Sequence, residues 1–203
     1  MFTPRDRELE RGWPGRIDGD RVIQLAAQTL QAFFSGGGVA REHATYALED
    51  VLFRAPVLHP PSVRIFDGDD FRFANPAAIV GPDDVVRLPA GADAIEPLLR
   101  IAAVIGVDGA IGGFTLLNDW HAPALAGTKA HDFALSLGPV VVTPDELELE
   151  GFDELVARAA ANTRLYPGDL VAAHGDASGP VGAGAVVEFE LEPFGTLRNV
   201  VIA

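Results

Sequence analysis

Apolar residues along this chain come in short runs that turn-forming residues separate. From residue 79 onward the runs lie at 79–80, 85–86, 101–106, 114–117 and 140–143, and an earlier run at 50–55 is closed by Pro56. Short apolar runs at this spacing favour antiparallel strands in a sandwich or roll over a βαβ series. We therefore expect a β-rich α+β fold.

The C-terminal part shows a second pattern. Strands are predicted at 169–173 and 186–192, and the latter alternates apolar residues at 187, 189 and 191 with glutamates at 188, 190 and 192. Such alternation is typical of a strand with one face buried and the other in water. The strand at 186–192 is thus expected to be half exposed, with its glutamates in water.

Two segments have helical character. Apolar residues at 21–34 recur near helical spacing and end at Ser35–Gly38, a strong stop signal. A second helix is predicted within 144–161, because residues 154–161 are good helix formers. Residues 1–15 are expected to be a flexible or weakly ordered lead. With no repeat or low-complexity linker, we predict a small N-terminal subdomain at 1–50 and a β-roll domain at 51–203.

The charge balance limits the possible partners. The net charge is −14, from 29 acidic and 15 basic residues, and such a surface repels phosphate backbones and anionic lipid. We expect no nucleic-acid or membrane partner, and an anionic substrate would need a local positive pocket.

The chain has no cysteine, which excludes disulfides and thiolate chemistry. No signal-peptide pattern and no membrane-length apolar run are present, so a soluble, cytoplasmic protein is expected.

Three motifs in the middle of the chain carry a family resemblance. They are Gly-Gly-Phe-Thr-Leu-Leu-Asn-Asp-Trp at 112–120, His-Asp-Phe-Ala-Leu-Ser-Leu-Gly-Pro at 131–139 and Thr-Pro-Asp-Glu-Leu at 143–147. Further landmarks lie at 55–57, 61–64, 73–82, 101–106, 165–169 and 194–199. In order and spacing the chain resembles the fumarylacetoacetate hydrolase family, from about Gly15 to the C-terminus.

The resemblance implies a mixed β-sandwich roll, homodimers, and an enzyme that cleaves, decarboxylates, hydrates or isomerises enolisable oxo acids. Enzymes of that family bind a divalent cation through four carboxylates, which suit a hard metal. Here three of the four positions hold Ile65, Leu98 and Arg100, and only Asp119 is kept. The sequence therefore predicts no metal and no other cofactor.

The family's catalytic lid is also missing. Family enzymes carry a glutamate and a histidine in a segment after the Pro-Ser-Val-Arg stretch, but here six residues separate Arg64 from Phe71 and none is a histidine. Asp67, Asp69 and Asp70 lie in this short segment. Their composition with Gly68 is typical of an exposed turn rather than a metal loop.

Histidines occupy several positions that line the pocket in the family. His121 follows the Asn-Asp-Trp motif, where the family continues toward a substrate-binding arginine; His131 replaces a lysine, and His174 replaces a small residue. Lys129, two positions before His131, could substitute for that lysine. Because histidine titrates near neutral pH, His121, His131 and His174 are candidates for proton transfer. The alternative is that they replaced polar residues after catalysis was lost. His43 and His59 lie outside the motifs and are interpreted as packing or surface residues.

Arg100 suggests a specific arrangement. We expect its guanidinium to take the old metal position and pair with Asp119, which would otherwise be a buried charge without a partner. A fixed guanidinium could also bind a substrate carboxylate in bidentate fashion. The pairing alone would equally explain its presence without any chemistry.

Three functions follow from these observations. The first is a metal-independent isomerase, lyase or cyclase that binds a small oxo acid or polyketone through Arg100, Asp119 and Lys129. The second is a catalytically inactive binding or assembly subunit, a pseudoenzyme. The third is a metal-dependent hydrolase of carbon–carbon bonds with displaced ligands.

Overall fold

A mixed, curled sheet forms the centre of the computed structural model, which describes residues 1–7, 9–37 and 39–203. Its strand order is β7-β6-β13-β10-β11-β12-β8, and β14 also pairs with β10. The strands are β6 (Val63–Asp67), β7 (Asp70–Ala74), β8 (Ile79–Val80), β10 (Leu98–Ile105), β11 (Ile111–Asp119), β12 (Leu135–Leu137), β13 (Leu170–Ala172) and β14 (Asp176–Ala177). The pairs β12–β8 and β13–β6 are parallel and the others antiparallel.

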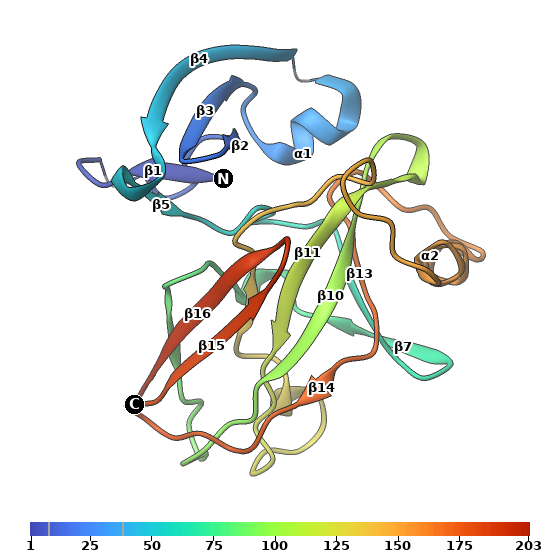
Figure 1. Cartoon of the computed structure of the whole chain (residues 1–203). Helices are drawn as coiled ribbons and strands as arrows, with labels where there is room; N and C mark the ends of the chain where they lie inside the picture. The colour runs from blue at the N-terminus through green and yellow to red at the C-terminus, as the bar shows by residue number, and fades with distance from the viewer. Residues whose placement is uncertain (8, 38) are drawn as a thin grey trace.

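The central strands are buried on both faces. Along β10, Ala102 and Val104 belong to one apolar cluster and Ala103 and Ile105 to another. Helix α2 (Phe152–Ala160) covers the second face, beside β13 and β10 in Figure 1. Burial on both sides explains why these strands are continuous apolar runs instead of alternating patterns. The predicted helix within 144–161 is confirmed.

A smaller sheet packs at the C-terminal end of the chain. It has the order β15 (Val186–Leu191), β16 (Gly195–Ile202), β9 (Val85–Arg87). Val187 and Val201 contact the cluster that contains the fully buried Trp120. Glu188 and Glu190 are exposed while Val187 is buried and Phe189 partly buried, which confirms the predicted alternation over 187–190. Leu191, predicted on the buried face, is exposed, because the strand ends there.

The N-terminal elements lie together at one end of the molecule (Figure 1). Strand β1 (Phe2–Pro4) pairs with β5 (Val51–Phe53), and β2 (Gly15–Asp18), β3 (Arg21–Ala26) and β4 (Val39–Ala47) form a three-stranded sheet. The pairing of β1 with β5 ties the first residues to the segment after residue 50, and the division at residue 50 stays a prediction.

Two sequence predictions fail in this region. The lead at 1–15, of which Glu8 lies outside the described residues, contains β1, and Phe2 and Thr3 are buried. The helix predicted at 21–34 is a strand for its first six residues, because β3 pairs on both sides and buries its β-branched Val22 and Ile23. Only α1 (Leu30–Ala32) and a π-type turn at Phe33–Gly37 are helical; Gly38 of the predicted stop lies outside the described residues.

Shorter features complete the chain. Short 3₁₀ segments occur at Leu48–Asp50, Pro76–Ala78, Val107–Gly109 and Gly127–Ala130. The strand predicted at 140–143 is reduced to a single bridge between Val142 and Phe114. Among the described residues, no helix is long and apolar enough to cross a membrane. The β-rich α+β prediction is confirmed.

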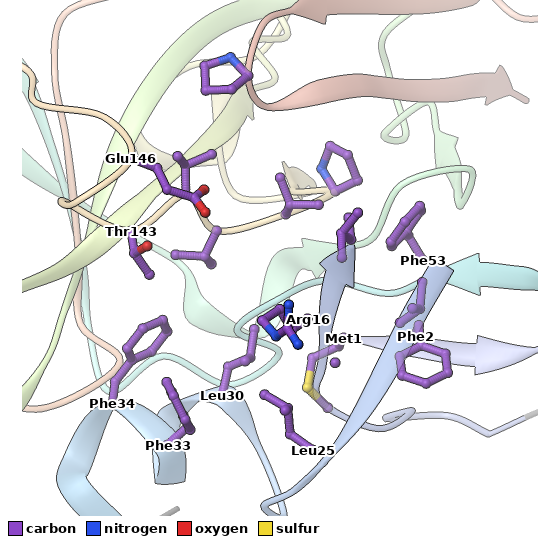
Figure 2. Close-up of a pocket in the computed structure, with 18 residues that line it drawn as sticks. Met1, Phe2, Arg16, Leu25, Leu30, Phe33, Phe34, Phe53, Thr143 and Glu146 are labelled. Atoms are coloured by element: carbon purple, nitrogen blue, oxygen red, sulfur yellow. The ribbon is translucent and has the colours of Figure 1, made fainter. Parts of the chain in front are cut away.

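A cavity of about 360 Å³ lies between the N-terminal elements and the segment 139–146 that follows β12. Figure 2 shows Phe33 and Phe34 on one side of it and Phe2 and Phe53 on another. Asp119 and the motif histidines do not line this cavity. The candidate site lies elsewhere, at the end of β11.

Candidate active site

Asp119 is the fully buried last residue of β11. Arg100 on β10 lies opposite Leu117, two residues before Asp119, so alternation places Arg100 and Asp119 on the same face of the sheet. Arg100 Nη2 lies 3.2 Å from Asp119 Oδ2, and the arginine side chain is 2% exposed. The expected ion pair between Arg100 and Asp119 is present.

A second guanidinium reaches the same carboxylate. Arg72 lies on β7 directly opposite Ile65 of β6, and its Nη2 donates to Asp119 Oδ2. The sequence does not indicate Arg72, because this arginine lies in none of the motifs that carry the family resemblance. The sequence feature that indicates its position is the Asp-Gly-Asp-Asp turn at 67–70. This turn closes the β6–β7 hairpin, in which Arg72 lies opposite Ile65.

Arg100 has further partners that hold it in place. It donates to Asp67 Oδ1 at 2.9 Å and to the carbonyl oxygens of Phe66 and Ala173 at 3.2 Å each. The backbone of Gly175 passes so close that an added Cβ would lie 2.5 Å from Arg100 Cγ. It would lie closer still to the carbonyl oxygen of Leu99, so a larger residue at 175 would clash with the backbone of β10 next to Arg100.

The acidic turn contributes more than predicted. Asp67, interpreted as part of a solvated turn, is half exposed and pairs with Arg100. Asp69 is exposed and lies near Arg158 of α2, with Nη1 and Oδ1 3.6 Å apart. Asp70 accepts a hydrogen bond from the backbone of Phe71 at 2.8 Å. All three aspartates are exposed at the hairpin turn, as predicted, and Asp67 in addition pairs with Arg100.

One of the three candidate histidines, His131, contacts Asp119, and a second, His121, stacks on it. His131 follows the 3₁₀ segment Gly127–Ala130, and its Nδ1 lies 3.3 Å from Asp119 Oδ1 and 3.2 Å from Arg72 Nη2. The ring of His121 stacks on that of His131, with centroids 4.6 Å apart. Both side chains are partly exposed, as is Arg72, so solvent reaches this side of the cluster.

His121 has a carboxylate partner of its own. Its Nδ1 lies 3.0 Å from Oε2 of Glu96, and both side chains are about 30% exposed. Sequence reasoning missed Glu96, which lies four residues before Arg100 and outside every motif. Its proximity follows from a bridge between the segments that precede β10 and follow β11.

The remaining candidates lie outside the cluster around Asp119. His174 is 75% exposed and its Nδ1 is 3.7 Å from Asp67 Oδ1, so it lies at the outer edge of the site. Lys129 is 76% exposed and pairs with Asp132 instead of Asp119. The structure thus does not bring Lys129 to the position expected for a substitute of the family lysine. His43 and His59 are exposed.

The ionisation of Asp119 depends on these partners. Burial acts to raise the pKa of Asp119, but the hydrogen bonds from His131 and Arg72, with their positive charge, outweigh burial and hold the pKa below its ordinary value of 3.8. The carboxylate is therefore charged at neutral pH, although it is inaccessible to water.

This direction predicts how acid affects stability. Because the folded pKa is lower than the unfolded one, Asp119 stabilises the fold fully above about pH 5 and loses this contribution as pH falls through its folded pKa. Urea denaturation at pH 7, 5 and 3.5 should show a smaller acid-induced loss for Asp119→Asn than for the wild-type protein. Equal losses would show that Asp119 does not contribute to the acid sensitivity.

The residues at the family's metal positions do not suit a hard divalent cation. Ile65 is fully buried in an apolar cluster, Leu98 supplies no donor, and Arg100 brings a positive charge. Both oxygens of Asp119 already accept from side chains. Among the described residues, no group of three or more histidine, cysteine, aspartate or glutamate residues could hold a metal ion. The arrangement is a carboxylate between two guanidiniums.

Comparisons with known proteins place the fold. A scan of family models finds no match. Protein Rv2993c of Mycobacterium tuberculosis is 29% identical over 178 residues, which cover 66% of this chain and 67% of that protein. The solved 5-carboxymethyl-2-hydroxymuconate delta-isomerase of Mycobacterium smegmatis superposes with a TM-score of 0.77 at 23% identity, over 99% of this chain and 97% of the isomerase. This chain has the fumarylacetoacetate hydrolase fold.

A more distant structure agrees. A 2-keto-3-deoxy-D-arabinonate dehydratase complexed with magnesium and 2,5-dioxopentanoate has a TM-score of 0.78 at 15% identity, over 99% of this chain and 97% of the dehydratase. The fumarylacetoacetate hydrolase fold thus carries isomerase and dehydratase chemistry in these two proteins. In the present chain its site contains two arginines around Asp119.

Proposed function

We propose that this protein binds a small anionic oxo acid or polyketone and catalyses a metal-independent proton transfer, as an isomerase, lyase or cyclase. The observation that carries the proposal is the convergence of Arg72 and Arg100 on Asp119, next to two partly exposed histidines. Two guanidiniums, of which Arg100 is held in place, bring positive charge to a site in a chain with a net charge of −14. The positive charge of Arg72, the partly exposed one of the two, favours an anion over a neutral ligand.

The two arginines have different roles in this proposal. Arg100 is buried and held by Asp67, Asp119 and two carbonyls, so it keeps the carboxylate of Asp119 charged and in place. Arg72 is 29% exposed and can turn a planar pair of donors toward an incoming carboxylate or enolate. Electrostatic stabilisation of an enolate oxygen by such a donor lowers the barrier to removal of the neighbouring proton.

Exchange of substrate protons with deuterium, which needs enolisation but no completed reaction, tests this function. 2-Oxobutanoate and 2-oxopentanedioate are incubated with the protein in D₂O and EDTA, and loss of the C3 proton signal is followed by NMR. We expect exchange with at least one compound to exceed the buffer rate and to be unaffected by EDTA. Exchange at the buffer rate for both compounds would contradict the proposal.

Metal independence makes a separate prediction. Thermal unfolding midpoints measured with EDTA and with millimolar magnesium or manganese should coincide, because a ligand that binds only the folded state must raise the midpoint. A clear increase with either metal would favour a metal-dependent hydrolase with displaced ligands. Sodium chloride at equal ionic strength is included to separate specific binding from general salt effects.

An inactive binding or assembly subunit is the second candidate. It is favoured by the way Arg72, Arg100 and His131 already satisfy both oxygens of Asp119, which is what a purely structural cluster would do. Isothermal titration with the same two compounds separates the alternatives. Binding without proton exchange would favour the subunit.

A further inference from the structure

The pair Glu96–His121 joins two segments that leave the main sheet at the same end. Glu96 precedes β10 and His121 follows β11, and their backbones exchange two hydrogen bonds, Glu96 N to His121 O at 2.7 Å and His121 N to Glu96 O at 2.9 Å. The side chains meet over this bridge, with Oε2 and Nδ1 3.0 Å apart. The backbone bridge therefore fixes the position from which each side chain starts.

The contact with Glu96 determines which ring nitrogen of His121 is free. A carboxylate only accepts hydrogen bonds, so the contact requires a proton on Nδ1. In the neutral ring, Nε2 then carries the lone pair. The stacked ring of His131, at 4.6 Å between centroids and 23° between planes, limits rotation of His121. The free Nε2 thus has a defined direction.

Glu96 acts on His121 more directly than Asp119 acts on His131. Among the described residues, the one ion-pair partner of Glu96 is His121. The charge of Asp119 is shared among Arg72, Arg100 and His131. His131 Nδ1 also lies 3.2 Å from Arg72 Nη2, so this nitrogen is already engaged between Asp119 and Arg72. Of the two histidines, His121 is therefore better placed to accept a proton.

We propose that His121 Nε2 is the base of this site and that Glu96 is its positioning residue. This inference rests on the proposed function. The bond between hydrogen and the carbon next to the substrate carbonyl breaks, the proton goes to Nε2, and the electron pair forms an enolate whose oxygen faces Arg72. Return of the proton to a different carbon completes an isomerisation with no other reactant.

The pair is built from elements other than the lid that this chain lacks. It places a glutamate and a histidine at the open side of the Asp119 cluster, where both are about 30% exposed. A small oxo acid that contacts Arg72 would lie next to the stacked imidazole rings, because Arg72 contacts His131 and His131 stacks on His121. The chemistry assigned to the pair is proton transfer from carbon.

Imidazole ¹⁵N NMR and proton exchange test the two parts separately. In the wild-type protein we expect the Nδ1–H tautomer at His121, and Glu96→Ala should shift it toward Nε2–H and slow exchange about tenfold. Glu96→Gln keeps an acceptor oxygen and should restore much of the tautomer and the rate. His121→Gln should slow exchange about 100-fold. Glu190→Ala, an exposed glutamate on β15, is the control and should leave both unchanged.

The tautomer measurement and the exchange rates can each contradict a different part of the proposal. An unchanged His121 tautomer in Glu96→Ala would overturn the positioning role, whatever the rates are. Wild-type exchange that is undiminished in His121→Gln would overturn the base assignment while leaving the proposed function standing. Absence of exchange in the wild-type protein would overturn the proposed function together with the base, and the tautomer measurement would still decide the role of Glu96.

Discussion

Arg100→Leu is expected to destabilise the protein by about 3 kcal/mol, because it leaves buried charge and buried carbonyls without their donor. Asp119 is fully buried and would retain only Arg72 and His131, and the carbonyls of Phe66 and Ala173 would lose a partner. Urea denaturation at pH 7 measures the loss. Arg87→Leu, at an exposed arginine on β9, is the matched control and should change stability little.

The double variant identifies the cause of that loss. Asp119→Asn alone should destabilise less than Arg100→Leu, because Arg100 keeps Asp67 and two carbonyls. Combining the two substitutions should recover part of the loss, with a coupling of about 1–3 kcal/mol. Additive effects would contradict the energetic importance of this ion pair, despite the 3.2 Å contact.

Arg72→Leu is expected to act on function more than on stability. Removal of the guanidinium that faces the substrate should slow proton exchange by about 100- to 1,000-fold, the range found when a single oxyanion donor is lost. Because Arg72 is partly exposed and Asp119 keeps Arg100, the loss of stability should be smaller than for Arg100→Leu. Exchange rates and urea midpoints are measured on the same preparations.

Arg72→Lys refines this result. Lysine keeps the charge but loses the planar fork of donors, so partial recovery would indicate that geometry matters as well as charge. Arg198→Leu, at a half-exposed arginine on β16 that pairs with Asp83 and Glu188, is the control for general loss of positive charge. Equal rates for Arg72→Leu and Arg198→Leu would contradict a specific role of Arg72.

The sequence predicted the β-rich part of the fold well because its signals are local. The apolar runs at 79–80, 85–86, 101–106 and 114–117 coincide with strands, and 154–160 lies within α2. Residues 21–26 were misinterpreted because helical spacing and buried strand pairing both tolerate Val22, Ile23 and Leu25, and the neighbours that decide between them are distant in sequence. Residues 1–4 were missed for the same reason, since their partner is β5.

The part of the candidate site that the sequence predicted lies on two paired strands, β10 and β11. Arg100 and Asp119 lie on adjacent strands, and alternation places them together. Arg72, Asp67 and Glu96 needed knowledge of a hairpin and of a bridge between loops, which no motif spacing encodes. Lys129 was placed near the site by its proximity in sequence to His131, but the 3₁₀ segment at Gly127–Ala130 leaves its side chain exposed.

The two guanidiniums around Asp119 have a consequence for assembly of the protein. A dissociable cation must be acquired after synthesis, competes with other ions, and is removed by chelators or by scarcity. Arg72 and Arg100 are covalent parts of the polypeptide, so their positive charge is in place as soon as the β6–β7 hairpin and β10 have folded. The positive charge that these two side chains bring to the site is therefore present whenever the chain is folded.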